Sequence, residues 1–136
     1  MSGLLLNTFI QFGGSGGDVV PDTFTLDSMD SNLTSTSDTI TGINTNITLR
    51  FTAIAGQFNT DDSLTIYKNA QQVSVWTGAS NFDLVVSNND IIEVNRLALH
   101  SPQVESDFRT INVYNQSDGG TTLTSFSCNF GYFNAG

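Results

Sequence analysis

Apolar and polar residues alternate along most of the chain from about residue 19 onward, with the two-residue period of a β-strand. The alternation is clearest at Ile47, Leu49, Phe51 and Ala53, where the intervening Thr48, Arg50 and Thr52 would face water. No stretch keeps the period of an amphipathic helix. We therefore predict short β-strands. Their alternation places these side chains inside: Leu49, Phe51, Ile66, Val75, Leu84, Val94, Val113 and Phe126.

Residues that favour turns separate these strands at intervals of roughly ten residues. The sequence KNAQ at residues 68–71 predicts a hairpin, because asparagine tolerates the left-handed backbone of a tight turn. SNND at residues 87–90 and SDGG at residues 117–120 are two further turn signals. About seven antiparallel strands over roughly 100 residues predict an all-β fold, an antiparallel immunoglobulin-like β-sandwich formed by residues 39–130.

One predicted strand changes the parity of its apolar residues. Ile92 and Val94 are even-numbered, whereas Leu97 and Leu99 are odd-numbered. A shift of one residue turns side chains to the other face of a sheet. We therefore predict a β-bulge near residues 95–96.

Residues 1–12 form an apolar segment, and GGSGG at residues 13–17 reads as a flexible linker. We expect residues 1–20 to be an extended N-terminal arm with its linker and residues 21–136 to be the sandwich domain. The arm lacks the basic start and cleavage site of a secretory signal and is too short to span a membrane. Its apolar residues, which we predict to bind a partner, are Leu4, Leu5, Leu6, Phe9, Ile10 and Phe12.

Two placements of the arm agree with this pattern. The arm can fold back as a strand on its own domain, or it can dock on a neighbouring subunit. In the second case main-chain hydrogen bonds to a sheet edge would provide affinity. Both placements stay open on the sequence alone, and we take docking on a neighbour as the working hypothesis.

Composition narrows the classes of partner. The 136 residues are 38% hydrophobic and 12% charged, which fits one compact domain. A net charge of -9 repels a phosphate backbone and an anionic lipid surface, so we expect neither nucleic acid nor membrane as a partner. The single cysteine, Cys128, cannot form an internal disulfide. Because it shares the apolar parity of Phe126 and Phe130, we predict a buried and unreactive thiol.

Groups that could carry catalysis or bind a metal are few. The single histidine, His100, lies beside Ser101, but no serine here has the G-x-S-x-G motif of an activated nucleophile. The acidic segments at residues 27–32 and 59–62 supply oxygen ligands without the spacing or the glycine of an EF-hand loop. One cysteine and one histidine cannot close a zinc site. We expect no catalytic residues, no metal and no cofactor.

Aromatic residues offer one further possibility. Together Tyr67, Trp76, Tyr114 and Tyr132 could form a platform on which a sugar stacks. In an all-β protein, however, aromatic residues at strand positions are usually part of the core or its rim. The platform therefore remains the less favoured of the two interpretations.

Two phrases of the sequence resemble a known family. The first is ITGINTNITL at residues 40–49, and the second is SNNDIIEV at residues 87–94. They resemble the immunoglobulin-like β-sandwich modules of bacteriophage virion structural proteins and of some bacterial surface proteins, in which ISGINxPIxLxV opens the body and SNGDxVxV follows in its second half. Asn46 stands where that pattern has proline, and Asn89 where it has glycine. Both replacements are tolerated in turns.

The resemblance covers most of residues 39–130 and implies a structural or binding role without an active site. We therefore expect a non-enzymatic protein of the phage virion, either a capsid accessory (decoration or cement) protein or a small head or tail component. It would attach through its arm to other virion proteins, such as the major capsid protein or head or tail proteins, and form a homo-oligomer in the particle. The alternative is a carbohydrate-binding or adhesive module of a phage fibre or bacterial surface protein.

Overall fold

The computed structural model describes residues 19–29, 33–54, 62–96 and 108–130. In these residues the chain forms β-strands and one short 3-10 helix, η1 (Gln116–Asp118). The strands in chain order are β1 (Ser35–Thr39), β2 (Ile47–Ala53), β3 (Leu64–Lys68), β4 (Gln71–Trp76), β5 (Phe82–Val86), β6 (Ile91–Arg96), β7 (Phe108–Asn115) and β8 (Thr121–Asn129).

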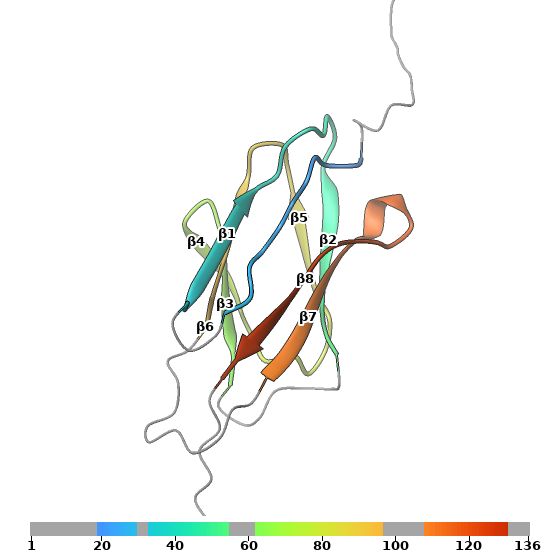
Figure 1. Ribbon diagram of the computed structural model, residues 1–136. Helices are drawn as coiled ribbons and strands as arrows, with labels where there is room; N and C mark the ends of the chain where they lie inside the picture. The colour runs from blue at the N-terminus through green and yellow to red at the C-terminus, as the bar shows by residue number, and fades with distance from the viewer. Residues whose placement is uncertain (1–18, 30–32, 55–61, 97–107, 131–136) are drawn as a thin grey trace, which may run out of the picture.

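The strands form two four-stranded sheets, which pack face to face (Figure 1). One sheet has the order β1-β6-β3-β4 and the other β5-β2-β7-β8, and all neighbours are antiparallel. The predicted all-β antiparallel sandwich is confirmed. The pairs β2–β5 and β3–β6 match the B–E and C–F pairs of the immunoglobulin fold. The closing strands are arranged differently, because β1 lies beside β6 and β7 lies beside β2.

The strand β2 shows how alternation produces a half-buried strand. Its residues Ile47, Leu49 and Phe51 are buried, while Thr48 and Arg50 are partly exposed, as predicted. Alternation in the other strands buries one face of each in the same way. Of the side chains predicted to lie inside, these are buried: Leu49, Phe51, Ile66, Leu84, Val94, Val113 and Phe126.

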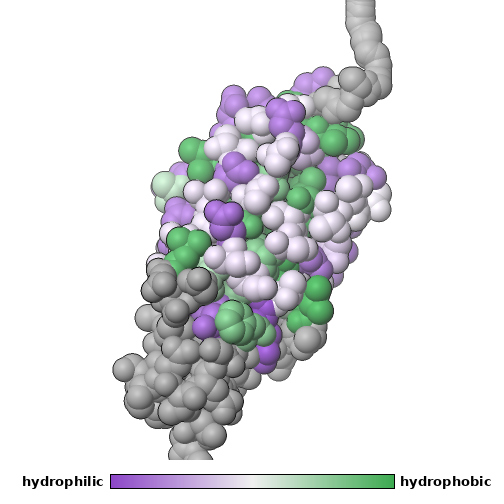
Figure 2. All heavy atoms as spheres, in the orientation of Figure 1, coloured by the Kyte–Doolittle hydropathy of each residue, from purple (hydrophilic) through white to green (hydrophobic). Residues whose placement is uncertain are grey.

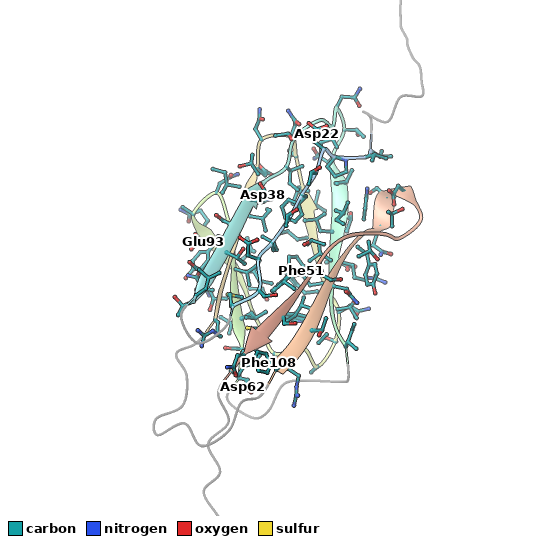
Figure 3. The ribbon with its side chains drawn as sticks, viewed as in Figure 1. Asp22, Asp38, Phe51, Asp62, Glu93 and Phe108 are labelled. Atoms are coloured by element: carbon teal, nitrogen blue, oxygen red, sulfur yellow. The ribbon has the colours of Figure 1, made fainter. Side chains whose placement is uncertain are left out.

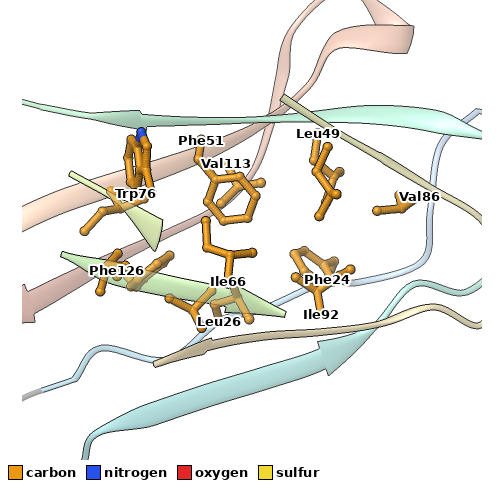
Figure 4. Packing of buried hydrophobic residues seen from close by; sticks show 14 of the residues in the cluster. Phe24, Leu26, Leu49, Phe51, Ile66, Trp76, Val86, Ile92, Val113 and Phe126 are labelled. Atoms are coloured by element: carbon orange, nitrogen blue, oxygen red, sulfur yellow. The ribbon is translucent and has the colours of Figure 1, made fainter. Parts of the chain in front are cut away.

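The core fills the space between the two sheets (Figure 4). Phe51 of β2 packs edge to face on Trp76 of β4, with ring centroids 6.1 Å apart. It also packs on Phe82 of β5 at 5.9 Å. Such aromatic pairs contribute about 0.5–1.5 kcal/mol beyond the burial of their area. Since β4 belongs to one sheet and β2 and β5 to the other, these rings help to join the two layers.

The prediction that Val75 lies inside is wrong, because its side chain is 54% exposed. The strand β4 has the opposite parity: Trp76 is buried, and Val73 and Val75 face water. Trp76 is the largest side chain of this strand and gains most from burial, so its parity decides which face turns inward. In addition, the register between β3 and β4 shifts between Ile66 and Tyr67.

The β-bulge predicted at Asn95 and Arg96 is also wrong. The pairing of β6 with β3 runs in unbroken register from Ile92 to Arg96, and its pairing with β1 is regular through Asn95. Arg96 simply continues the buried parity of the strand. The change of parity at Leu97 and Leu99, on which the prediction depended, falls outside the described residues.

The three predicted turns are present. In the hairpin between β3 and β4, Asn69 and Ala70 have φ values of 53° and 67°. Two consecutive positive φ values are what a type I′ hairpin turn requires. Asn89, in the turn before β6, has a φ of 75°. The helix η1 ends at Gly119, which has a φ of 97°.

Candidate docking surfaces

The residues that we predict to bind a partner lie outside the described residues: Leu4, Leu5, Leu6, Phe9, Ile10 and Phe12. The structure does describe the point at which the arm joins the body. There the side-chain amide of Asn115 donates from Nδ2 to the carbonyl oxygen of Val19 at 2.7 Å. Asn115 is fully buried at the end of β7. Asp22, at the upper end of the molecule in Figure 3, donates its backbone N–H to Thr41 at 2.8 Å.

Residues 22–29 close one side of the sandwich, where they run between β1 and β8 (Figure 1). On the β1 side, the backbone N–H of Thr25 donates to Oδ2 of Asp38 at 2.7 Å. The N–H of Asp27 donates to Oγ1 of Thr36, also at 2.7 Å. Side chains of β1 therefore bind this segment in place of a further strand.

On the β8 side, the same segment pairs with the strand backbone. The N–H of Met29 donates to the carbonyl of Ser127, and the N–H of Asn129 donates to the carbonyl of Met29, both at 2.8 Å. The N–H of Leu26 donates to Oγ1 of Thr124 at 3.1 Å. These bonds satisfy groups that an edge strand would otherwise expose. Three apolar residues of the segment also join the core: Phe24, Leu26 and Met29.

The opposite side of the sandwich has the edges of β4 and β5. Charged groups occupy the β5 edge: Lys68 donates from Nζ to the carbonyl of Val85 at 3.0 Å. On the same strand Asp83 accepts two hydrogen bonds from Arg50, at 2.8 and 2.9 Å. The Arg50 guanidinium lowers the pKa of the Asp83 carboxyl, mainly through these hydrogen bonds. Lysine and other charges at an edge disfavour the addition of another strand.

The strand β4 has neither a covering segment nor a charge in the described residues, although its register with β3 shifts at Val73, as in a β-bulge. Its sequence, QQVSVW, contains neither a charged residue nor a proline. Within the described part of the chain it pairs with β3 alone, so its other backbone edge faces away from the sheet. Val73 and Val75 on its outer face are 36% and 54% exposed. Of the four sheet edges in the described residues, β4 is therefore the one with neither a covering segment nor a charge.

Elsewhere the exposed apolar residues are dispersed. On the face seen in Figure 2 they lie among polar residues and do not form one continuous patch. The outer face of the β5-β2-β7-β8 sheet carries a row of polar groups that bind one another. Asn112 donates from Nδ2 to the hydroxyl of Tyr114 at 3.1 Å and accepts a hydrogen bond from Ser125, and Thr52 donates to Asn81 at 3.0 Å.

The structure does not assemble the aromatic platform. Trp76 is buried in the core, where its indole N–H donates to the carbonyl of Ser80 at 2.6 Å. Tyr67 and Tyr114 belong to different sheets, and the alternation of their strands turns them to opposite outer faces. Tyr132 lies outside the described residues. The three described rings therefore share no surface on which a single sugar could stack.

Cys128 is fully buried, as predicted. Its burial raises the pKa of the thiol to about 12, an effect to which Asp62 adds and which Arg96 opposes. Arg96 and Asp62 are themselves buried. Asp62 lies at the lower end of the molecule in Figure 3, and Arg96 pairs with Leu64, two residues after Asp62. Arg96 donates from Nη2 to the carbonyl of Leu33 at 3.1 Å. The thiol is therefore protonated at neutral pH and does not act as a nucleophile.

Within residues 19–29, 33–54, 62–96 and 108–130, no three His, Cys, Asp or Glu side chains are grouped so that they could hold a metal ion. His100, Asp61 and most of the acidic segment at residues 59–62 lie outside this part of the chain. In the same described part, no helix has the length and apolar character needed to cross a membrane.

Comparison of the sequence with protein-family models and with curated proteins found no match. Comparison of the structure with solved structures found a likeness to the N-terminal domain of PorA. The two are 14% identical, the match covers 83% of this chain and 88% of that chain, and the TM-score is 0.36. A superposition this loose carries no inference about function.

Proposed function

We propose that this protein is a non-enzymatic structural component of a phage particle, either a capsid accessory (decoration or cement) protein or a small head or tail protein. In this proposal it attaches through its N-terminal arm to other virion proteins and displays its β-sandwich. The observation that carries the proposal is the way in which the two family-like phrases meet in the fold.

These phrases, far apart in the sequence, bind each other at one end of the sandwich. The N–H of Ile40 donates to the carbonyl of Asp90 at 2.8 Å, and the N–H of Asn89 donates to the carbonyl of Ile40 at 2.6 Å. The N–H of Ile43 donates to Oδ1 of Asn88 at 3.2 Å. One structural unit therefore contains both phrases, which supports the resemblance better than two separate matches would.

The backbone of this unit also fits the family pattern. Gly42 and Asn89 have φ values of 85° and 75°, and both stand where the pattern has glycine. Left-handed backbone is the conformation that glycine adopts most easily and that asparagine tolerates. The replacement of glycine by asparagine at residue 89 therefore keeps the turn that the pattern requires.

The arm has enough apolar surface for attachment. Each of its six large apolar side chains contributes about 1.5–3 kcal/mol when fully buried, before the cost of ordering the tether is subtracted. The side chain of Asn115 binds the chain at Val19, so the tether to a docked arm starts from a fixed point on the body. The net charge of -9 keeps free copies apart before assembly.

The test replaces Leu6, Phe9 and Ile10 by Asp and measures the copy number of the variant in purified particles by gel. We expect loss of incorporation with an unchanged melting temperature of the isolated protein. The matched control places Asp at Val85 and Ile91, which are 53% and 49% exposed on the body, and should be incorporated normally. Incorporation of the arm variant at the wild-type copy number would overturn the proposal.

One observation supports a second function, that of a carbohydrate-binding or adhesive module. The outer row formed by Asn112, Tyr114 and Ser125 presents partly exposed groups of the kind that hydrogen-bond sugar hydroxyls. A glycan array with the full chain tests this alternative. Binding that is lost when Tyr114 and Asn112 are replaced by Ala would favour it, and an array without binding would favour the structural role.

A further inference from the structure

We propose that β4 is the acceptor site for the N-terminal arm, so that residues 4–12 of one copy add as a strand to the β4 edge of a second copy. The inference rests on the proposed function, in which the arm is the attachment element, and it names the surface that the arm binds. Three lines of argument lead to it: the other edges, the faces of the arm and the charges.

The other three edges are unsuitable. Residues 22–29 cover β1 through Thr36 and Asp38 and cover β8 through backbone hydrogen bonds of Met29. At β5, Lys68 binds an edge carbonyl. An exposed, uncharged edge strand without proline is a template for pairing with another chain. In the described residues β4 is the edge with this character.

The arm has a sequence that fits this edge. In a strand, its even-numbered residues share one face, and four of them are apolar: Leu4, Leu6, Ile10 and Phe12. The odd-numbered face is mixed, with Leu5 and Phe9 separated by Asn7. The apolar face matches the inner side of β4, which Trp76 shares, and the mixed face matches the outer side, next to Val75. The nine residues 4–12 exceed the six of β4, so the arm is long enough for this edge.

The charge distribution permits docking between copies. All 13 acidic residues lie in residues 18–136, and the arm has no charged side chain. Two acidic bodies repel each other, but this repulsion is screened beyond about 8 Å at physiological ionic strength. The five residues 13–17 span up to about 17 Å when extended. A neutral arm on such a tether can reach the neutral β4 edge of a neighbour while the two bodies stay apart.

The reach of the tether brings β4 of either copy within range. In the sheet ordered β1-β6-β3-β4, the strand β4 is at the far edge, about 14 Å from β1 at the usual spacing of strands. The extended tether covers this distance, so the choice of a neighbour rests on the proposed function, in which the arm is the attachment element. Each copy then gives one arm and receives one, which builds a ring or a chain of copies.

Disulfide trapping with the full chain tests the proposal. Cys128 is buried and does not compete, so introduced cysteines are the reactive thiols. A variant with Asn7→Cys is mixed with a variant with Val73→Cys or Val75→Cys and oxidised mildly. We expect a covalent heterodimer on a non-reducing gel, with a yield that rises with protein concentration. The matched control, Val85→Cys on β5, should give no heterodimer.

Three results would overturn the inference. These are an equal yield with Val85→Cys, a crosslink that forms only within one chain of the double variant Asn7→Cys/Val73→Cys, and no crosslink in any mixture. If the arm is required for incorporation into particles but does not crosslink to β4, the proposed function stands and the acceptor is another protein. If the arm is dispensable for incorporation, the proposed function fails, whatever the crosslinks show.

A charge at the edge provides a second measurement. Val75→Lys places an ammonium group on β4, whereas Ile91→Lys places one on an exposed residue of the central strand β6. Only Val75→Lys should lower the average mass of the assemblies that light scattering detects at high protein concentration. Neither substitution should change the melting temperature. An equal effect of both substitutions would contradict docking on β4.

Discussion

Asp22 occupies the space that a side chain on Gly42 would need. A Cβ atom on Gly42 would lie 2.6 Å from Oδ1 of Asp22, which is too close for any real contact. Asp22 is held there by its own N–H, which donates to Thr41 at 2.8 Å, and by the Thr41 hydroxyl, which donates to its carboxylate at 3.1 Å. The absence of a side chain at Gly42 thus allows the segment after the arm to lie against the turn before β2.

We expect Gly42→Ala to lower the free energy of unfolding by more than Gly119→Ala. Gly119 has a similar φ of 97° but open space around it. Alanine there costs only the strain of an L-residue in left-handed backbone, about 1–2 kcal/mol. At Gly42 the methyl group also displaces the Asp22 carboxylate, and loss of its hydrogen bond from Thr41 adds about 1 kcal/mol to the cost. Urea denaturation measures both changes. Equal losses would show that Asp22 moves aside without cost.

Ala70→Gly should stabilise the protein by up to about 1 kcal/mol. Ala70 has a φ of 67° in the hairpin between β3 and β4, a conformation that strains an L-residue and suits glycine. The relief exceeds the entropy that glycine adds to the unfolded chain. Ala53→Gly, at the last residue of β2, is the control and should destabilise. A lower urea midpoint for Ala70→Gly would contradict the assigned turn.

The buried thiol of Cys128 should make stability fall at alkaline pH. Its pKa is raised from 9.0 to about 12 in the folded protein, so above pH 9.0 the unfolded chain loses this proton while the folded chain keeps it. The free energy of unfolding then decreases by up to about 1.4 kcal/mol per pH unit between these values. Cys128→Ala should remove this slope, as measured by urea denaturation from pH 8 upward.

The same thiol should resist modification. At neutral pH a disulfide reagent is expected to react with the unfolded protein but not with the native protein, since both burial and the raised pKa suppress the thiolate. Rapid reaction of the native protein would mean that β8 opens readily around Cys128.

Asn115→Ala should destabilise the protein by about 1–3 kcal/mol, the cost of a lost buried hydrogen bond. Its Nδ2 binds the Val19 carbonyl, and its Oδ1 accepts from the N–H of Ser117 at 3.0 Å. The root of the arm should also become more sensitive to proteases near Val19. Asn112→Ala, which removes hydrogen bonds on the outer face, is expected to cost less, about 0.5–1.5 kcal/mol, because no buried polar group is left without a partner there.

Two truncations separate the arm from the body. Deletion of residues 1–17 should leave the melting temperature nearly unchanged, because in the proposed function the arm serves attachment and not folding. Deletion of residues 1–29 should unfold the domain, since Phe24, Leu26 and Met29 each contribute about 1.5–3 kcal/mol when buried. If the shorter deletion unfolds the protein, the arm is a strand of its own domain.

The sequence by itself determined the strands, their turns and most of the core. The alternation of Ile47, Leu49 and Phe51 depends on the period of a single strand, and the turn at Asn69 depends on the φ of a few neighbouring residues. Such local preferences act in the same way wherever the strand is placed. The apolar arm and its glycine linker are also visible in the sequence, because they are matters of composition.

Only the tertiary structure decided which parity of β4 faces inward and which edges stay open. Both parities of β4 contain apolar residues, so the choice between Val75 and Trp76 depends on contacts with Phe51 on the facing sheet. The covering of β8 depends on the bond between Leu26 and Thr124, residues 98 positions apart. A strand period specifies two faces but carries no information on partners so distant in sequence. Among the described residues, these partners cover β1 and β8 and leave β4 without a covering segment.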